Sequence, residues 1–102
     1  MKVVYSRTAA RQIEAQIDYL ISQHAPAAAA RARTRIFTFI ADFVARHPRA
    51  GCHIPEKGIY EIWIPRTKYV LFYRVETGDA LRVLALFHTS QDRSHFDPAK
   101  AD

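Results

Sequence analysis

Histidine and cysteine are the residue types in this sequence of 102 residues that could bind a metal or carry out proton and nucleophile chemistry. The chain has five histidines but a single cysteine, Cys52, so no internal disulfide can form. A structural zinc site needs about four Cys or His ligands at close spacing, and the sequence has no such cluster. His47, His53 and His95 are predicted to lie in loop or tail segments, which give no ligand geometry. We therefore expect neither a metal nor another cofactor.

Arginine is the other residue type whose spacing could do chemistry. The first half of the chain carries eight Lys or Arg against three Asp or Glu, whereas the second half carries seven of each. The densest part of this excess consists of Arg31, Arg33, Arg35, Arg46 and Arg49. Such a segment would attract an acidic protein or nucleic acid. A solvated helix face that keeps the protein soluble would explain the same charges.

The elements that position these residues begin with two helices. A short β-prone start precedes a helix that Ser6 or Thr8 can cap and that ends near His24. Pro26 is suited to open a second helix, which carries an apolar stripe and ends near Arg46. Because the connection between them is short, the two helices should form an antiparallel hairpin.

Three β-strands are predicted in the second half, after an irregular loop over residues 49–58. Their predicted ranges are 59–64, 68–75 and 80–87. The order is βααβββ, and the composition fits one domain over residues 1–102. We therefore predict an α+β fold in which the N-terminal strand and the helical hairpin pack on one face of a small, mainly antiparallel sheet. The edge at which the first strand pairs remains open at this stage.

Tight hairpins between the strands would place Ile64 opposite Tyr69 and Val75 opposite Ala80. The face expected under the helices then holds Tyr60, Ile62, Ile64, Tyr69, Leu71, Tyr73, Leu84 and Leu86. The opposite face holds Ile59, Glu61, Trp63, Val70, Phe72, Arg74, Val83, Ala85 and Phe87.

The second face of the sheet is the first candidate for a binding surface. Two helices in a hairpin cover only one side of such a sheet, so Trp63, Val70 and Phe72 should form an exposed apolar patch that fits a partner. The alternative is that the loop at 49–58 and the C-terminal tail fold over this face.

Membrane and secretory segments are not expected in this sequence. No apolar run approaches the ~18 residues that cross a bilayer. The start, MKVVYSRTAARQ, becomes polar before a secretory apolar region could form. We therefore expect a cytoplasmic protein that does not contact a membrane.

Four segments carry a family resemblance over nearly the whole chain: VVYSRTAARQIEAQIDYL, RHPRAG, YEIWIPRTKYVLFYRVE and LALFHTSQDR. Together with the βααβββ order, they resemble the RelE/ParE superfamily of toxins from bacterial type II toxin–antitoxin modules. HPRAG and LFHTSQD look most like the ParE branch, whose characterised members poison DNA gyrase. Other branches cleave messenger RNA in the ribosomal A site.

The resemblance implies that the chemistry of RelE-like ribonucleases is missing here. Those enzymes use Lys and Arg on the open sheet face and an aromatic hydroxyl near the C-terminus. Matched by strand position, these groups fall on Glu61, Trp63, Val70, Ser90 and Phe96, where that chemistry is absent. We therefore expect a toxin that acts by binding.

An enzyme remains the alternative, because related interferases use a Glu with a terminal His. If the protein were a ribosome-dependent mRNA interferase, its candidate residues would be Glu61, His88 and Arg93. A cross-strand ion pair between Glu61 and Arg74 would explain Glu61 without catalysis. A third reading is an inactive homologue that only binds antitoxin.

The resemblance also implies two protein partners. DNA gyrase would be contacted by His88, Gln91, Asp92, Arg93, Arg66 and Lys68. A cognate antitoxin would lay its C-terminal segment across the toxin, and operator DNA would be bound only indirectly, through the antitoxin. The residues expected to contact the antitoxin are Trp63, Val70, Phe72, Arg31 and Arg35.

Overall fold

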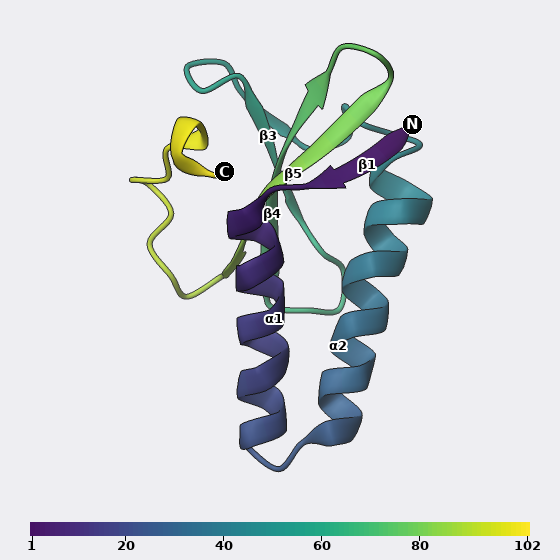
Figure 1. Ribbon diagram of the computed structural model, residues 1–102, viewed down its shortest axis with the longest axis vertical. Coiled ribbons are helices and arrows are strands. Elements are labelled where there is room, and N and C mark those ends of the chain that lie inside the picture. Colours follow the sequence, from purple (N-terminus) through teal and green to yellow (C-terminus); the bar gives the residue numbers. More distant parts are fainter.

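The computed structural model describes all 102 residues and combines a helical hairpin with one β-sheet (Figure 1). The elements are β1 (Lys2–Tyr5), α1 (Arg7–Ser22), α2 (Pro26–Phe39), β2 (Cys52–Ile54), β3 (Ile59–Trp63), β4 (Tyr69–Glu76) and β5 (Ala80–His88). A π-helical turn, η1 (Ile40–Val44), continues α2, and a 3-10 turn, η2 (Pro98–Lys100), lies near the C-terminus. The predicted α+β fold and the order of its main elements are confirmed. No helix is long and apolar enough to cross a membrane.

The five strands form a single sheet in the order β1-β5-β4-β3-β2. β1 runs parallel to β5, and the other three pairs are antiparallel. The first strand, whose edge the sequence left open, therefore pairs beside the last one. The predicted loop at 49–58 contains the short strand β2, which pairs with β3. A three-residue strand shows too little alternation to be detected from sequence.

Ser6 fixes the start of α1 to the sheet. Its buried hydroxyl oxygen accepts the backbone N–H of Ala9 at 3.0 Å, which caps the helix, and the hydroxyl donates to the Leu84 carbonyl at 2.9 Å. Ser6, one of the two predicted caps, is therefore the observed one. From this anchor, α1 turns Ile13 and Ile17 toward the sheet, where both are buried.

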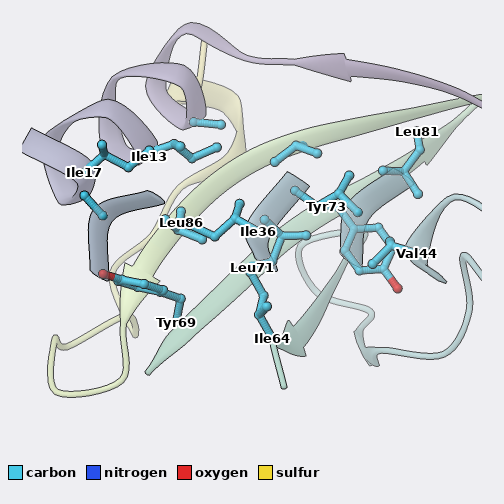
Figure 2. Packing of buried hydrophobic residues seen from close by; sticks show 14 residues of the cluster. Ile13, Ile17, Ile36, Val44, Ile64, Tyr69, Leu71, Tyr73, Leu81 and Leu86 are labelled. Carbon is cyan, nitrogen blue, oxygen red and sulfur yellow. The ribbon is translucent and has the colours of Figure 1, made fainter. Parts of the chain in front are cut away.

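The main core lies between the helices and one face of the sheet. Fourteen buried residues form it, and Figure 2 shows Ile13 and Ile17 of α1 in the same layer as Leu71 and Tyr73 of β4. The Tyr73 hydroxyl donates to the Pro48 carbonyl at 2.8 Å and accepts the Gly51 N–H at 3.2 Å. The core thereby holds the segment that leads from η1 into β2.

The second face of the sheet is covered by the tail. The prediction that Trp63, Val70 and Phe72 form an exposed apolar patch is therefore wrong for two of these three residues. Val70 and Phe72 are buried, whereas Trp63 is 60% exposed as predicted. Phe96 of the tail stacks on Phe72 with ring centroids 5.0 Å apart, and Ala101 belongs to the same cluster. In Figure 1 the yellow tail turns back toward the sheet. Because both faces of this sheet are apolar, the tail supplies the second cover.

The loop before β3 helps to hold the tail in place. The Lys57 ammonium group donates to the carbonyl of Ser94 at 3.2 Å and to that of Phe96 at 2.8 Å. The alternative in which loop and tail fold over the face is therefore the arrangement observed.

The register of β4 and β5 differs from the prediction on the turn side of the hairpin. Ile64 and Tyr69 are joined as predicted, by a backbone hydrogen bond of 3.0 Å, but Val75 lies opposite Leu81 and not Ala80. The irregularity lies at Phe72 and Tyr73 of β4. On the turn side of this irregularity the one-residue offset makes Val83 face the helices, and Leu84, which has no partner in β4, faces the tail, both opposite to the prediction. Beyond it, Ala85, Leu86 and Phe87 have the predicted faces.

Candidate partner-binding surfaces

Glu61 lies on the tail-covered face and is held by Arg93. Its Oε2 is 3.4 Å from Arg93 Nε, and Arg93 also donates to the Thr89 carbonyl at 3.3 Å. The two side chains are only 24% and 21% exposed. An ion pair was predicted for Glu61, but with the wrong partner, because Arg74 is engaged elsewhere.

Arg74 contributes to a separate ion-pair cluster on the β4–β5 hairpin. It lies directly opposite Arg82, and Glu76 binds both, at 3.0 Å and 3.1 Å. The hydrogen bonds from Arg74 and Arg82 lower the pKa of the Glu76 carboxyl. Because Arg74 and Arg82 both bind the Glu76 carboxylate, Arg74 is not available to Glu61, which pairs with Arg93 instead.

His88 lies on the other face of the sheet from Glu61. Glu61 pairs with Phe72 and Phe72 pairs with Ala85, so these three residues share one face of the sheet. Successive residues of a strand point to opposite faces, and His88 lies an odd number of residues beyond Ala85, so it points to the other face. The ring of His88 contacts Tyr69 of the helix-covered core edge to face, and its Nδ1 is 2.7 Å from Ser90 Oγ. The structure therefore does not bring together the Glu and His of the enzyme alternative.

Two further predicted target residues, Gln91 and Asp92, lie in the turn that leads from β5 into the tail. Gln91 Oε1 accepts the His88 backbone N–H at 2.7 Å. Asp92 Oδ1 accepts the backbone N–H of Ser94 at 3.0 Å and its hydroxyl at 2.8 Å, and these hydrogen bonds lower the pKa of Asp92. Gln91 and Asp92 are exposed, so a partner can still reach them.

A pocket with a volume of about 270 Å³ lies between the two helices, the β3–β4 turn and the end of β5. Four cationic side chains line it: Arg31, Arg35, Arg66 and Lys68. We call it the cationic pocket. His88 lies at the same pocket, and no Asp or Glu lines it. The structure thus joins two predicted antitoxin residues to three predicted target residues and separates them from the turn at Gln91 and Asp92.

Helical spacing explains which arginines enter the cationic pocket. Arg31 and Arg35 are four residues apart and share one face of α2. Arg33 points elsewhere and lies 3.5 Å from Glu14 of α1. The spacing was visible in the sequence, but the turn that brings Arg66 and Lys68 opposite this face was not.

A second surface, which was not predicted from the sequence, lies between α2, η1 and the β3–β4 turn. Phe39 and Phe43 stack with ring centroids 5.1 Å apart, and both line a groove of about 360 Å³ next to Pro65. Phe43 is partly exposed. The spacing of four residues was a signal for this pair. No three His, Cys, Asp or Glu side chains gather in a way that could hold a metal ion.

Comparison with known proteins identifies the family. The family model described as "ParE toxin of type II toxin-antitoxin system, parDE" matches residues 3–93. The chain belongs to the ParE toxin family. The resemblance predicted from the motifs is therefore confirmed.

Solved structures with a similar fold to this ParE-family chain include a toxin–antitoxin system. It is described as "Chromosomal ParDE TA system from P. aeruginosa", has a TM-score of 0.71, and is 21% identical in sequence. The likeness covers 86% of this chain and 95% of that one. No curated protein matches the chain. The ParE match includes the cationic pocket and the Glu61–Arg93 pair, whereas Phe96 and the rest of the tail lie beyond it.

Proposed function

We propose that this ParE toxin binds DNA gyrase in the cytoplasm, blocks replication, and is neutralised by a cognate antitoxin. The ParE family match over residues 3–93 carries this proposal. The toxin would act by binding and not by catalysis.

The geometry of the sheet supports binding as the mode of action. A metal-independent ribonuclease needs a base and an acid on the same side of the scissile phosphate. Here Glu61 is paired with Arg93 on one face, and His88 lies on the other. Neither is placed to act with the other on one substrate.

The target surface would include the cationic pocket and the exposed turn after β5. Gln91 and Asp92 belong to that turn, while Arg66, Lys68 and His88 line the pocket. Arg93 would act indirectly, since it ties the turn to the sheet through Glu61.

The antitoxin surface would centre on Trp63, which is 60% exposed. A large exposed aromatic residue is a common anchor for a protein partner. Val70 and Phe72 are withdrawn from this surface because both are buried, Phe72 under Phe96 of the tail.

The test is supercoiling of relaxed plasmid by purified gyrase and ATP in the presence of the folded toxin. We expect loss of supercoiling and accumulation of linear DNA, both reversed by the antitoxin. Glu61→Gln should still inhibit gyrase, with at most a small loss from the weakened contact to Arg93, because its carboxylate has no catalytic part in this proposal.

A folded toxin that left supercoiling intact would contradict the proposal. Cleavage of messenger RNA in a translation assay, abolished by Glu61→Gln, would then identify an interferase. Tight antitoxin binding with neither effect would identify an inactive homologue.

A further inference from the structure

We infer that the cationic pocket binds a phosphodiester group of DNA, so that the toxin contacts nucleic acid directly. The oxyanion site follows from the charges and shape of the pocket. The choice of DNA rests on the proposed function, since gyrase acts on DNA.

The four cations of the pocket have no counter-charge of their own. Elsewhere Arg33, Arg74, Arg82 and Arg93 each lie within 4.0 Å of a carboxylate. Arg31, Arg35, Arg66 and Lys68 have no such partner, although they line the same pocket. Like charges placed together repel each other unless an anion lies between them. The missing anion is therefore expected from a ligand.

Two well-defined elements hold these cations in place. Arg31 and Arg35 lie one turn apart on α2, and Arg35 Nη1 donates to the Arg66 carbonyl at 3.2 Å. The Thr67 hydroxyl donates to the Ile64 carbonyl at 2.7 Å and accepts the Tyr69 N–H at 3.1 Å, which fixes the turn. An arrangement fixed before binding lowers the entropy cost of holding a ligand.

The density of charge favours a nucleic-acid backbone over a single carboxylate. One carboxylate would offset one of four positive charges, whereas a DNA strand carries a charge about every 3.4 Å and can meet several cations together. Arginine also binds phosphate through paired hydrogen bonds. Tyr19 lines the pocket and is 60% exposed, so its ring offers a surface on which a base can stack. With a volume of about 270 Å³, the pocket would take the backbone of one strand of a duplex and not the full width of the duplex.

The test measures binding of a fluorescently labelled DNA duplex to the toxin alone, without gyrase, over a series of salt concentrations. The pocket variant is Arg31→Gln with Lys68→Gln. Both side chains are exposed and make no hydrogen bond, so the fold should persist, as thermal unfolding will verify. The matched control is Arg46→Gln with Arg49→Gln, which removes the same charge from the far end of the second helical segment and the loop after it.

We expect the pocket variant to bind DNA about tenfold or more weakly at low salt. Its slope of log K against log salt should be shallower by about 2, because each phosphate contact contributes about 0.9. The control should keep both the affinity and the slope of the unchanged toxin. Equal losses in the two variants would overturn the inference, since only net charge would then matter.

Two comparison ligands decide the source of the anion. Tighter binding of an RNA duplex of matched sequence would overturn the choice of DNA. Tighter binding of a polyglutamate peptide, lost in the pocket variant, would show a site for acidic protein and overturn the inference. Because gyrase is absent, failure here is distinct from failure of the proposed function, which the supercoiling assay reports separately.

Discussion

At the scale of single residues, Tyr73 connects the core to the segment before β2. Its ring is buried between helices and sheet, and its hydroxyl bonds to both Pro48 and Gly51. Burial of the phenol raises the pKa of Tyr73. Gly51 must be small at this point, because an added Cβ would lie 2.9 Å from that hydroxyl and 2.8 Å from the Glu61 carbonyl.

Tyr73→Phe should therefore lower the free energy of unfolding by about 1–3 kcal/mol, because the Pro48 carbonyl and the Gly51 N–H lose their partner. Chemical denaturation measures the change. Tyr60→Phe is the matched control, since Tyr60 stacks on Tyr73 at 5.4 Å but its hydroxyl makes no hydrogen bond. Equal effects of the two substitutions would contradict this role for the hydroxyl.

Trp63 is the only tryptophan and is 60% exposed, so its fluorescence reports on its own surroundings. Binding of the antitoxin should shift the emission to shorter wavelength, because the partner would remove the indole from water. Trp63→Ala should weaken antitoxin binding by about 2 kcal/mol or more, as expected of an anchor residue. An unchanged emission spectrum in the formed complex would place the antitoxin elsewhere.

At the scale of elements, the β4–β5 hairpin depends on Glu76 to separate two facing arginines. Arg74 and Arg82 lie directly opposite each other, which would repel, and the Glu76 carboxylate bonds to both. Arg82 also reaches Asp102 at 3.2 Å, so the same cluster fastens the end of the tail.

The lowered pKa of Glu76 gives a pH dependence with a defined sign. The folded state holds the ionised form more strongly than the unfolded state does, so this stability is present above the ordinary pKa of 4.5 and lost as pH falls through the lower folded value. Glu76→Gln should therefore be less stable than the unchanged protein at neutral pH, and the difference should shrink in acid. Unfolding curves over a range of pH measure it, and a constant difference would contradict this origin.

At the scale of the whole molecule, the two faces of the sheet are covered by different parts of the chain. The helical hairpin covers one face with a core of fourteen buried residues, and the tail covers the other through the smaller cluster around Phe72. The exposed binding surfaces are the cationic pocket, which lies at the edge of the helical hairpin, and Trp63.

Phe96→Ala should remove the tail from the sheet and lower the free energy of unfolding by about 2–3 kcal/mol. This is below the ~3–5 kcal/mol of a fully buried Phe, because Phe96 is partly exposed. Binding of an apolar fluorescent dye should rise as Phe72 becomes accessible. His95→Ala, at an exposed neighbouring position, is the control. Unchanged dye binding by Phe96→Ala would mean that other residues hold the tail.

The sequence alone was enough to predict the βααβββ order, the Ser6 cap as one of two candidates, the Ile64–Tyr69 register and the exposure of Trp63. These features depend on local spacing and on alternation within single strands. The ParE resemblance was also carried by segments that can be read along the chain.

Only the tertiary structure decided which residues meet. The offset at the β4–β5 turn and the irregularity beside Tyr73 decided the faces of Val83 and Leu84, since a shift of one residue puts a side chain on the opposite face of the sheet. The partner of Glu61 and the burial of Phe72 depended on where the tail folds, and a polar tail has no periodicity that fixes its path. The cationic pocket likewise joins residues more than thirty positions apart, which contact each other because the β3–β4 turn lies against the helices.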